Sequence, residues 1–433
     1  MSVNWKNIGL FTLLVVMFLV AGFLQGWNVV LQVLNLGLIS AIMALGVNMQ
    51  WGYAGLFNTG VVGFAALGGL AVVLVSSPFD PGAWAAGGWR IPFALMFGAG
   101  IIALAGVIWK RLPGGWVSAL PILAILIAGF FVFRLFFDPA VAAVESITPA
   151  ATGNIGGLGL PVLLSWPVGG LLAAGAAWIV AKTALGLRSD YLAIATLGIA
   201  EIIIAILKNE DWLDRGVKNV IGLPRPVPYE VDLQQSAAFV DWTTRHGFDL
   251  QTASSIVVKL CYTGLFAAVL LVLLLLAQLS LNSPWGRMMR AIRDNEVAAE
   301  AMGKDVVRRH LQVFVIGAVL IGVAGAMMTT LEGQLTPASY NPLRFTFLIW
   351  VMVIVGGSGN NWGAVLGGLM IWFFWVEVEP MGLWLIDWIT VAMPDGPLKA
   401  HLIDSAAQMR LPTMGIILLL ALRFSPRGLI PEK

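Results

Sequence analysis

Charged residues are scarce in this sequence. Lysine, arginine, aspartate and glutamate make up 11% of the 433 residues, whereas a typical soluble domain contains about 25%. Hydrophobic residues make up 59%, and a soluble protein of this composition would expose more apolar surface than a monomer tolerates. The composition therefore excludes an ordinary soluble enzyme, a nucleic-acid-binding protein and a disordered chain. It indicates that the chain's main partner is the lipid bilayer.

Residues that commonly carry chemistry are also few. Cys261 is the only cysteine, so the chain has no internal disulfide and no multi-thiolate metal site. His246, His310 and His401 are far apart and match no metal-binding spacing. The sequence contains no phosphate-binding motif of the form GxxxxGK[ST], which excludes ATP hydrolysis by that route. We therefore expect no metal, no cofactor and no catalytic residues in this chain.

Long apolar runs are abundant instead. A helix that crosses a bilayer needs about 20 mainly apolar residues, and we predict about twelve such spans, within a range of about ten to fourteen. This predicts an all-α, polytopic membrane helical bundle that forms a single transmembrane domain over residues 1–433. Residues 343–376 are interpreted as two short spans, with one long tilted helix or a re-entrant pair as the alternatives. The predicted spans are Ile8–Leu24, Val29–Met49, Tyr53–Ser76, Pro92–Trp109, Trp116–Phe136, Leu158–Ala181, Tyr191–Leu207, Ile256–Leu279, Leu311–Leu331, Leu343–Gly356, Trp362–Val376 and Leu411–Leu422.

The distribution of lysine and arginine predicts the orientation of these spans. If the N-terminus is cytoplasmic, the cytoplasmic segments hold 14 of the 25 basic residues, as the positive-inside rule requires. Residues 281–310 then form the largest cytoplasmic loop, and the C-terminus is cytoplasmic too. Residues 208–255 form an extracytoplasmic segment, and residues 77–157 contain an extra hairpin.

Two glycine-rich runs interrupt the apolar pattern. One starts at Gly52 and reads GYAGLFNTGVVGFAALGGL, and the other starts at Gly356 and reads GGSGNNWGAVLGG. One interpretation is close helix packing, through the overlapping GxxxG units of Gly359, Gly363 and Gly367. The other is a broken helix that lines a cavity, since irregular backbone at membrane depth must be buried or wetted. The polar residues in these runs are Asn58, Thr59, Asn360 and Asn361.

A single acidic residue lies inside a predicted span. Glu201 is about ten residues into the run Tyr191–Leu207, where a charged group costs roughly 2.5–3.5 kcal/mol on insertion scales. The side chain must therefore face protein, water or a partner chain, or be protonated. Both a structural hydrogen bond to a neighbouring helix and a role in a pathway or interface remain open.

The cytoplasmic loop Leu281–His310 carries a regular pattern of arginines. Arg287, Arg290 and Arg293 are spaced i, i+3 and i+6, which places them on one face of a helix. Basic cytoplasmic loops are common in membrane proteins, so the loop is either an ordinary loop of this kind or a docking element. A short helix with charges of both signs and an alanine and methionine face suits insertion into a groove of a soluble partner.

Several stretches together resemble a known family. They include GYAGLFNTGVVGFAALGGL, LGLRSDYLAIATLGIAEIIIAIL, SPWGRMMRAIRDNEVAAEAMG, VIVGGSGNNWGAVLGG and the terminal RFSPRGLI. In these stretches the sequence is similar to the permease subunits of ABC importers for branched-chain amino acids, in the LivM-like branch that also includes urea and short-amide systems. The stretches are collinear and cover most of the chain outside residues 77–157 and the polar outer segments.

The resemblance implies a transport role without chemistry in this chain. It implies a heterodimer with a second permease subunit, two cytoplasmic ABC ATPase subunits that use ATP, and an extracytoplasmic substrate-binding protein. The expected location is a bacterial-type inner membrane. By match, the candidate residues for coupling to an ATPase are Arg287, Arg290, Arg293, Glu296, Ala298, Ala299 and Gly303. The residues expected either in the translocation pathway or in the family's central motif are Asn58, Thr59, Asp190, Tyr191, Thr196, Glu201, Asn360 and Asn361.

The substrate stays open between branched-chain amino acids, urea and short amides. Two departures from the family bear on it: residues 213–224 read LDRGVKNVIGLP where relatives often have a TGGxxGI run, and the hairpin 92–136 is an insertion relative to shorter members. A stand-alone channel or secondary transporter is the alternative from another class. It would not need a docking loop, and an ion-coupled version should show intramembrane ionisable groups, of which Glu201 is the obvious one. An intramembrane enzyme lacks any visible catalytic constellation.

Overall fold

The computed structural model describes residues 5–111, 116–147, 153–391 and 396–432. These residues form helices almost throughout, with one antiparallel pair of two-residue strands, β1 (Val220–Ile221) and β2 (Gln334–Leu335). The first helices are α1 (Trp5–Gln25), α2 (Trp27–Val47), the π-helix η1 (Asn48–Gly52), α3 (Val61–Ser76), α4 (Pro81–Ala83), α5 (Arg90–Arg111), α6 (Trp116–Glu145), α7 (Ser165–Ala184), α8 (Ser189–Asn209) and α9 (Asp211–Asp214). The later helices are α10 (Glu230–Gln235), α11 (Ala237–His246), α12 (Leu250–Asn282), α13 (Pro284–Asp294), α14 (Glu296–Ala301), α15 (Val306–Glu332), α16 (Leu348–Gly356), α17 (Asn361–Thr390), α18 (Pro397–Ala406) and α19 (Arg410–Phe424).

The predicted all-α membrane bundle is confirmed. Among the described residues, nine helices are long and apolar enough to cross a membrane, or ten if the bent pair of 397–405 and 410–424 is one span. Each of the twelve predicted spans coincides with a helix. The three that do not reach full length as a single helix are α3, α16 and α19. Residues 53–60, which the sequence placed in a continuous span with α3, are not helical.

The centre of the bundle is α15, which packs mainly against α7, α3 and α2, while α17 packs against α2. Glycines allow the backbones to approach closely. A Cβ atom at Gly325 of α15 would clash with the backbone of Ala65 in α3, and one at Gly68 would clash with the backbone of Gly322. Such contacts stabilise membrane helices through dispersion, because lipid tails give helices no hydrophobic reason to associate.

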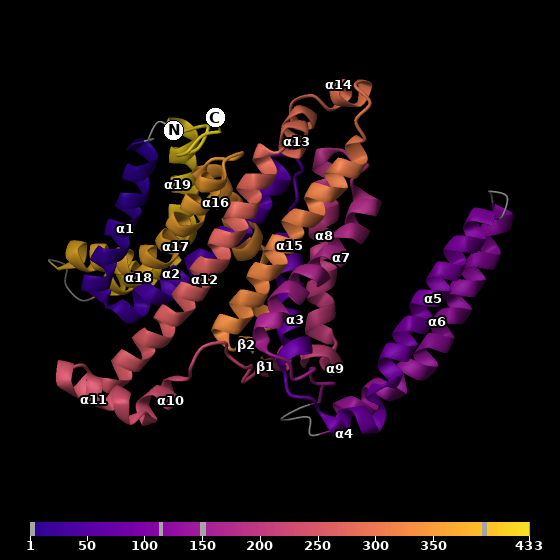
Figure 1. The fold of residues 1–433 in the computed structure, drawn as a ribbon, viewed down its shortest axis with the longest axis horizontal. Coiled ribbons are helices and arrows are strands. Elements are labelled where there is room, and N and C mark those ends of the chain that lie inside the picture. Colours follow the sequence, from indigo (N-terminus) through magenta and orange to yellow (C-terminus); the bar gives the residue numbers. More distant parts are fainter. Residues whose placement is uncertain (1–4, 112–115, 148–152, 392–395, 433) are drawn as a thin grey trace.

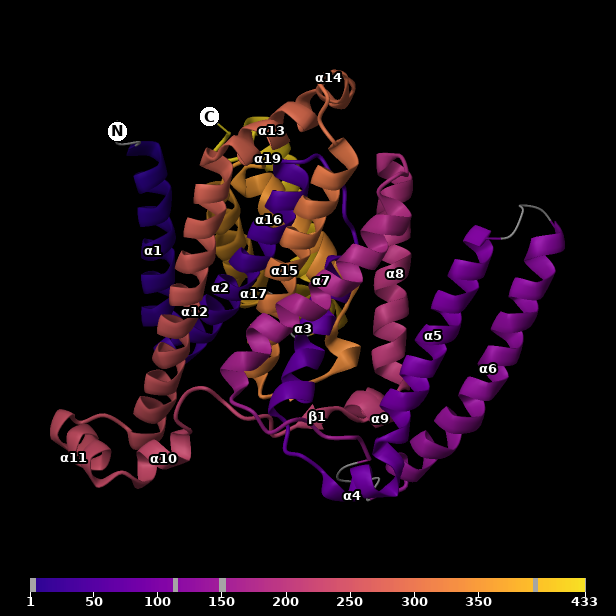
Figure 2. The same cartoon turned by 45° about the vertical axis from the view of Figure 1, so that its right-hand side comes forward.

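Both termini and the loop helices α13 and α14 lie at one end of the bundle, which we call the loop end (Figure 1). Helices α4, α9, α10 and α11 and the strand pair lie at the other end (Figures 1 and 2). This arrangement places residues 281–310 and both chain ends together, as the distribution of basic residues predicted.

Helices α5 and α6 form an antiparallel hairpin that stands apart from α7 and α8 over most of its length and meets the bundle near α4 (Figure 2). The joint has its own small core of Ala83, Ile91, Ala140, Val144 and Trp212. Along the hairpin, large apolar side chains such as Phe131 and Leu135 are exposed in the isolated chain.

Helices α16 and α17 pack against each other around a tight turn at residues 357–360. One long tilted helix over residues 343–376 is therefore excluded. Gly363 and Gly367 face the backbones of Gly356 and Met352. Gly359, in contrast, lies in the turn before α17 with φ +77°, a left-handed conformation that glycine adopts without strain. Gly359 therefore forms part of the turn, and only Gly363 and Gly367 make the expected close helix packing.

Candidate functional site: a buried polar network linked to the loop end

The interior of the bundle contains polar side chains where α2 gives way to irregular backbone. The last turn of this span is the π-helix η1, and residues 53–60 follow it without helical structure. Asn48, Gln50 and Asn58 in this region are fully buried. A buried amide without partners costs free energy, so each of these side chains must find hydrogen bonds inside the protein.

Asn48 joins η1 to the turn between α16 and α17. Its Oδ1 accepts a hydrogen bond from the backbone N–H of Gly359 at 2.9 Å, and its Nδ2 donates to Oδ1 of Asn361 at 3.2 Å. Asn361 in turn donates to Oε1 of Gln278 in α12 at 3.3 Å. The side chains of Asn48 and Asn361 thus connect three segments that are more than 80 residues apart in sequence.

Gln50 and Asn58 hold the irregular segment in place. Gln50 donates to the carbonyl of Phe314 in α15 at 2.8 Å and accepts from Nδ2 of Asn58 at 2.8 Å. Oδ1 of Asn58 accepts from the N–H of Gly60 at 2.8 Å, and the Asn58 carbonyl accepts from the indole N–H of Trp350 at 3.0 Å. The polar groups that the broken helix exposes are therefore satisfied by neighbouring helices, as burial at membrane depth requires.

Thr59 extends the network to α8 and to the segment before α16. Its N–H donates to Oγ1 of Thr196 at 3.1 Å, and its hydroxyl donates to the carbonyl of Ala193 at 2.5 Å. The hydroxyl of Thr346 donates to the Thr59 carbonyl at 3.2 Å. Thr346 belongs to the π-helix η6 (Leu343–Phe347). The irregular segment 53–60 therefore contacts η6 directly here.

Arg293 connects this network to the loop end. Its guanidinium donates to the carbonyl of Gly52 in η1 and forms ion pairs with Glu432 at 2.9 Å and with Asp294 at 3.3 Å. Arg293 projects from α13, Gly52 ends η1, and Glu432 belongs to the C-terminal segment. A movement of α13 would therefore act directly on η1.

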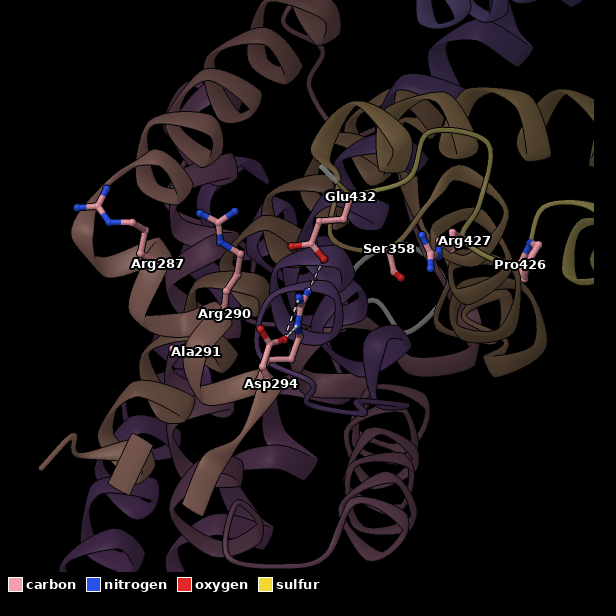
Figure 3. A pocket seen from close by; sticks show the side chains of 9 residues that line it. Arg287, Arg290, Ala291, Asp294, Ser358, Pro426, Arg427 and Glu432 are labelled. Atoms are coloured by element: carbon pink, nitrogen blue, oxygen red, sulfur yellow. Dashed lines mark hydrogen bonds and ion pairs between the residues drawn. The ribbon is translucent and has the colours of Figure 1, made fainter. Parts of the chain in front are cut away.

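A cavity of about 790 Å³ opens between α13 and the C-terminal segment. Figure 3 shows Arg287, Arg290 and Arg427 around it, with Glu432 between Arg290 and Arg427. Four arginines (Arg293 is the fourth) and two acidic residues line the cavity, so it carries excess positive charge. The predicted clustering of the three α13 arginines on one face agrees with their position on this one cavity.

The loop is built from two helices rather than one. Asn295 ends α13 and caps α14, where its Oδ1 accepts from the N–H of Ala298 at 3.0 Å. The buried side of α13 is Gly286, Met289 and Ile292, so the alanine and methionine face expected on a single helix is not its packing face. The remaining candidates lie in or after α14: Glu296, Ala298, Ala299 and Gly303, of which Ala299 is buried and Gly303 adopts φ +74°.

The motif residues of α8 are divided between two faces of the helix. Thr196 is buried and joins the network. Asp190, Tyr191 and Glu201 are exposed on the opposite side. The structure therefore does not bring these three residues to the buried polar network. Asn360 also lies outside it, because it caps α17 and donates to the carbonyl of Pro431.

Several members of the network were not among the predicted site residues: Asn48, Gln50, Gln278, Thr346, Trp350 and Glu432. Asn48 and Gln50 gave a usable signal, since they are polar residues at the end of an apolar span. Glu432 gave none, because an acidic residue near a chain end is ordinary.

The network consists of amides, hydroxyls, one indole, and one guanidinium with its carboxylate partners. It contains no nucleophile next to a base, and no group of three or more potential metal ligands occurs in the part of the chain that the structure describes. Such an arrangement can hold irregular backbone in a defined state and transmit displacement. The fold and the network together define a polytopic membrane protein whose broken helices are joined by a buried polar network.

Comparison with known proteins identifies the family. The family model described as branched-chain amino acid transport system / permease component matches residues 140–393, and the chain belongs to this family. No solved structure matches the chain.

Three curated relatives illustrate the similarity. The high-affinity branched-chain amino acid transport system permease protein LivM of Escherichia coli (strain K12) is 28% identical over 281 residues, which are 65% of this chain and 63% of LivM. The probable branched-chain amino acid transport permease protein LivM of Methanocaldococcus jannaschii is 25% identical over 395 residues, 90% of each chain. The xylose transport system permease protein XylH of Escherichia coli (strain K12) is 24% identical over 304 residues. The match thus covers less than two thirds of the Escherichia coli LivM protein.

Proposed function

We propose that this chain is the permease subunit of an ATP-driven importer that moves branched-chain amino acids across the inner membrane. The names of the LivM relatives and of the family support the substrate class. The observation that carries the mechanism is the set of contacts made by Arg293, which joins the loop end to η1 and to the C-terminal segment.

The chain contributes a conformational change, and its partners contribute the ATP hydrolysis. One of the two cytoplasmic ATPases contacts α13 and α14 and moves them when it binds and hydrolyses ATP. Because Arg293 is bonded to η1, this movement shifts Asn48, Gln50 and the irregular segment 53–60. The bundle then changes from inward-facing to outward-facing.

The two ends of the bundle have different partners in this proposal. The loop end and both termini are cytoplasmic. The opposite end, where α10 and α11 lie (Figure 2), faces outward and receives an extracytoplasmic substrate-binding protein. A second, different permease completes the membrane part.

Reconstitution tests the function. The chain, assembled in proteoliposomes with its second permease, its ATPases and its binding protein, should take up labelled leucine only when ATP is present on the ATPase side. Uptake of urea but not leucine would replace the substrate class and leave the permease assignment intact. Leucine uptake that is independent of ATP and of the ATPases would overturn the assignment in favour of a channel or secondary transporter.

Charge reversal in the arginine-lined cavity tests the coupling. The double variant Arg287→Glu/Arg290→Glu should lose ATP-driven uptake, because it inverts the charge that faces the ATPase, while membrane insertion stays normal. The matched control is Lys110→Glu/Arg111→Glu, which reverses the same number of charges in the last turn of the hairpin helix α5. Normal uptake by the double variant would contradict the docking role of the cavity.

A further inference from the structure

The exposed face of α8 carries an ionisable side chain near the middle of the span. Glu201 is the thirteenth of the 21 residues of α8, near the middle of the span. Its side chain is exposed, and no hydrogen bond or ion pair of Glu201 occurs within the described part of the chain. The buried side of the helix consists of Leu192, Thr196, Ala200 and Ile204, so α8 has one packed face and one open face.

Lipid is a poor neighbour for this open face. A carboxylate at the centre of a bilayer costs roughly 2.5–3.5 kcal/mol on insertion scales, and such groups almost always face protein or water. Within the described part of the chain the main contacts of α8 are with α3 and α7, and they leave Glu201 exposed. A partner outside this chain would cover the carboxylate.

The open face has the shape of a helix-packing surface. Helical geometry places Ile194, Gly198 and Ala205 on the same side as Glu201, and Ile194 is 70% exposed. A Cβ atom at Gly198 would meet nothing within 4 Å, so another helix backbone can approach closely there.

The hairpin of α5 and α6 flanks this face without covering it. The hairpin is joined to the bundle at the end away from the loops. There Phe137 contacts Trp212 with ring centroids 5.8 Å apart, and Glu145 accepts a hydrogen bond from the N–H of Trp212 at 3.2 Å. From this joint the hairpin diverges from α8 (Figure 2).

We propose that the open face of α8 around Glu201, flanked by the α5–α6 hairpin, is the surface that binds the second permease subunit. We call this surface the seat. The proposal rests on the importer function proposed above. Glu201 lies at the seam between the two subunits, where a donor of the partner or water at the seam satisfies the carboxylate. The hairpin extends the contact beside the seat.

The charge of Glu201 favours an unlike partner over a second copy of this chain. Two copies would meet through a two-fold interface, in which each residue near the axis faces its own counterpart. A helix packed through this face would then bring two Glu201 carboxylates together, and like charges in a low dielectric repel each other strongly. Both a LivM and a LivH permease of Methanocaldococcus jannaschii are similar to this chain, which shows that one organism can hold two unlike permeases of this type.

Photo-crosslinking in the assembled importer tests the seat. A benzophenone amino acid at Ile194 on the open face of α8 should form an adduct with the second permease, identified by mass spectrometry. The same probe at Leu271, an exposed position of α12, serves as the comparison and should give no such adduct. No protein adduct at Ile194, or an adduct with a second copy of this chain, overturns the proposal.

Variants of Glu201 test the seam itself. Glu201→Leu should weaken co-purification of the two permeases by roughly tenfold, equivalent to about 1.4 kcal/mol, whereas Glu201→Gln, which keeps hydrogen bonding, should retain most of it. Equal co-purification of Glu201→Leu and wild type contradicts the role of the carboxylate. Wild-type uptake separates the two proposals: ATP-driven uptake without an Ile194 adduct rejects only the seat, whereas absent uptake rejects the importer function.

Discussion

At the scale of single residues, the interior of this protein depends on a few polar side chains that are fully paired. Asn48, Gln50 and Asn58 each bond two or more partners. Arg293 adds a positive charge, which Asp294 and Glu432 neutralise and which the Gly52 carbonyl helps to hold in place. Satisfied buried networks are rigid and specify a unique arrangement, so the loop end and the bundle interior are held in one defined relation.

Asp214 predicts a pH dependence of stability. The side chain is fully buried, and its Oδ2 has no partner among the described residues. Burial, with a smaller contribution from the nearby Asp211, raises the pKa of Asp214 from its ordinary value to about 7, although the N–H of Gly216 opposes the shift. The folded state thus binds the proton more tightly than the unfolded state, so stability falls as the pH rises from about 4 to about 7.

The variant Asp214→Asn should remove this dependence. Between pH 5 and pH 8 the free energy of unfolding should fall by roughly 2–3 kcal/mol more in the wild type than in the variant. Thermal unfolding in detergent at both pH values measures this difference. The control is Asp241→Asn, since Asp241 is exposed and paired with Arg245 at 3.0 Å. An equal pH dependence in wild type and Asp214→Asn would contradict the assignment.

At the scale of elements, the bundle relies on helices that are broken or short. The π-helix η1, the irregular residues 53–60 and the hairpin of α16 and α17 all meet around the Asn48 side chain. Glycines permit the hairpin, because the backbones of Gly367 and Met352 are too close for any side chain between them. Such tightly packed interfaces have few alternative arrangements, which suits elements that switch between discrete states.

Gly367→Ala should destabilise the protein. The added Cβ would clash with the Met352 carbonyl and force α16 and α17 apart, at a cost of about 1–3 kcal/mol. Gly264→Ala in α12 is the matched control, since a Cβ there meets nothing within 4 Å. Thermal unfolding in detergent should separate the two variants, and equal melting temperatures would reject the close approach of the hairpin.

At the scale of the whole molecule, the two ends of the bundle carry different elements. Both termini, α13 and α14 lie at the end that holds the arginine-lined cavity, and the outer segment with α10 and α11 lies at the other (Figure 1). In the proposed importer, the second permease covers the open face of α8 beside the diverging hairpin.

Labelling of single cysteines checks the sidedness. In a Cys261→Ala background, Val297→Cys in α14 should be protected from a membrane-impermeant thiol reagent added to intact cells, whereas Val231→Cys in α10 should react. Val297 and Val231 are 77% and 56% exposed, so access within the fold does not limit the reaction. Reaction of Val297→Cys from outside would reverse the orientation and remove the cytoplasmic docking role of the loop.

Part of the site was accessible from sequence. Asn58, Thr59 and Asn361 stood out because polar residues inside glycine-rich apolar runs are unusual, and all three take part in the network. Asp190, Tyr191 and Glu201 were grouped with Thr196 by a linear motif. The helix separates them, because residues a few positions apart on a helix can point in opposite directions.

The sequence by itself determined the membrane-spanning helices, because the transfer of an apolar run into lipid depends on local composition. It also predicts their orientation, through the charges that flank each run. Only the tertiary structure decided which polar groups meet, since Asn48 and Asn361 are 313 residues apart and no local pattern encodes that pairing. The same holds for Glu201, whose open surroundings follow from where α3 and α7 pack. Hydrophobicity is a property of a segment, whereas a hydrogen bond is a property of two segments brought together.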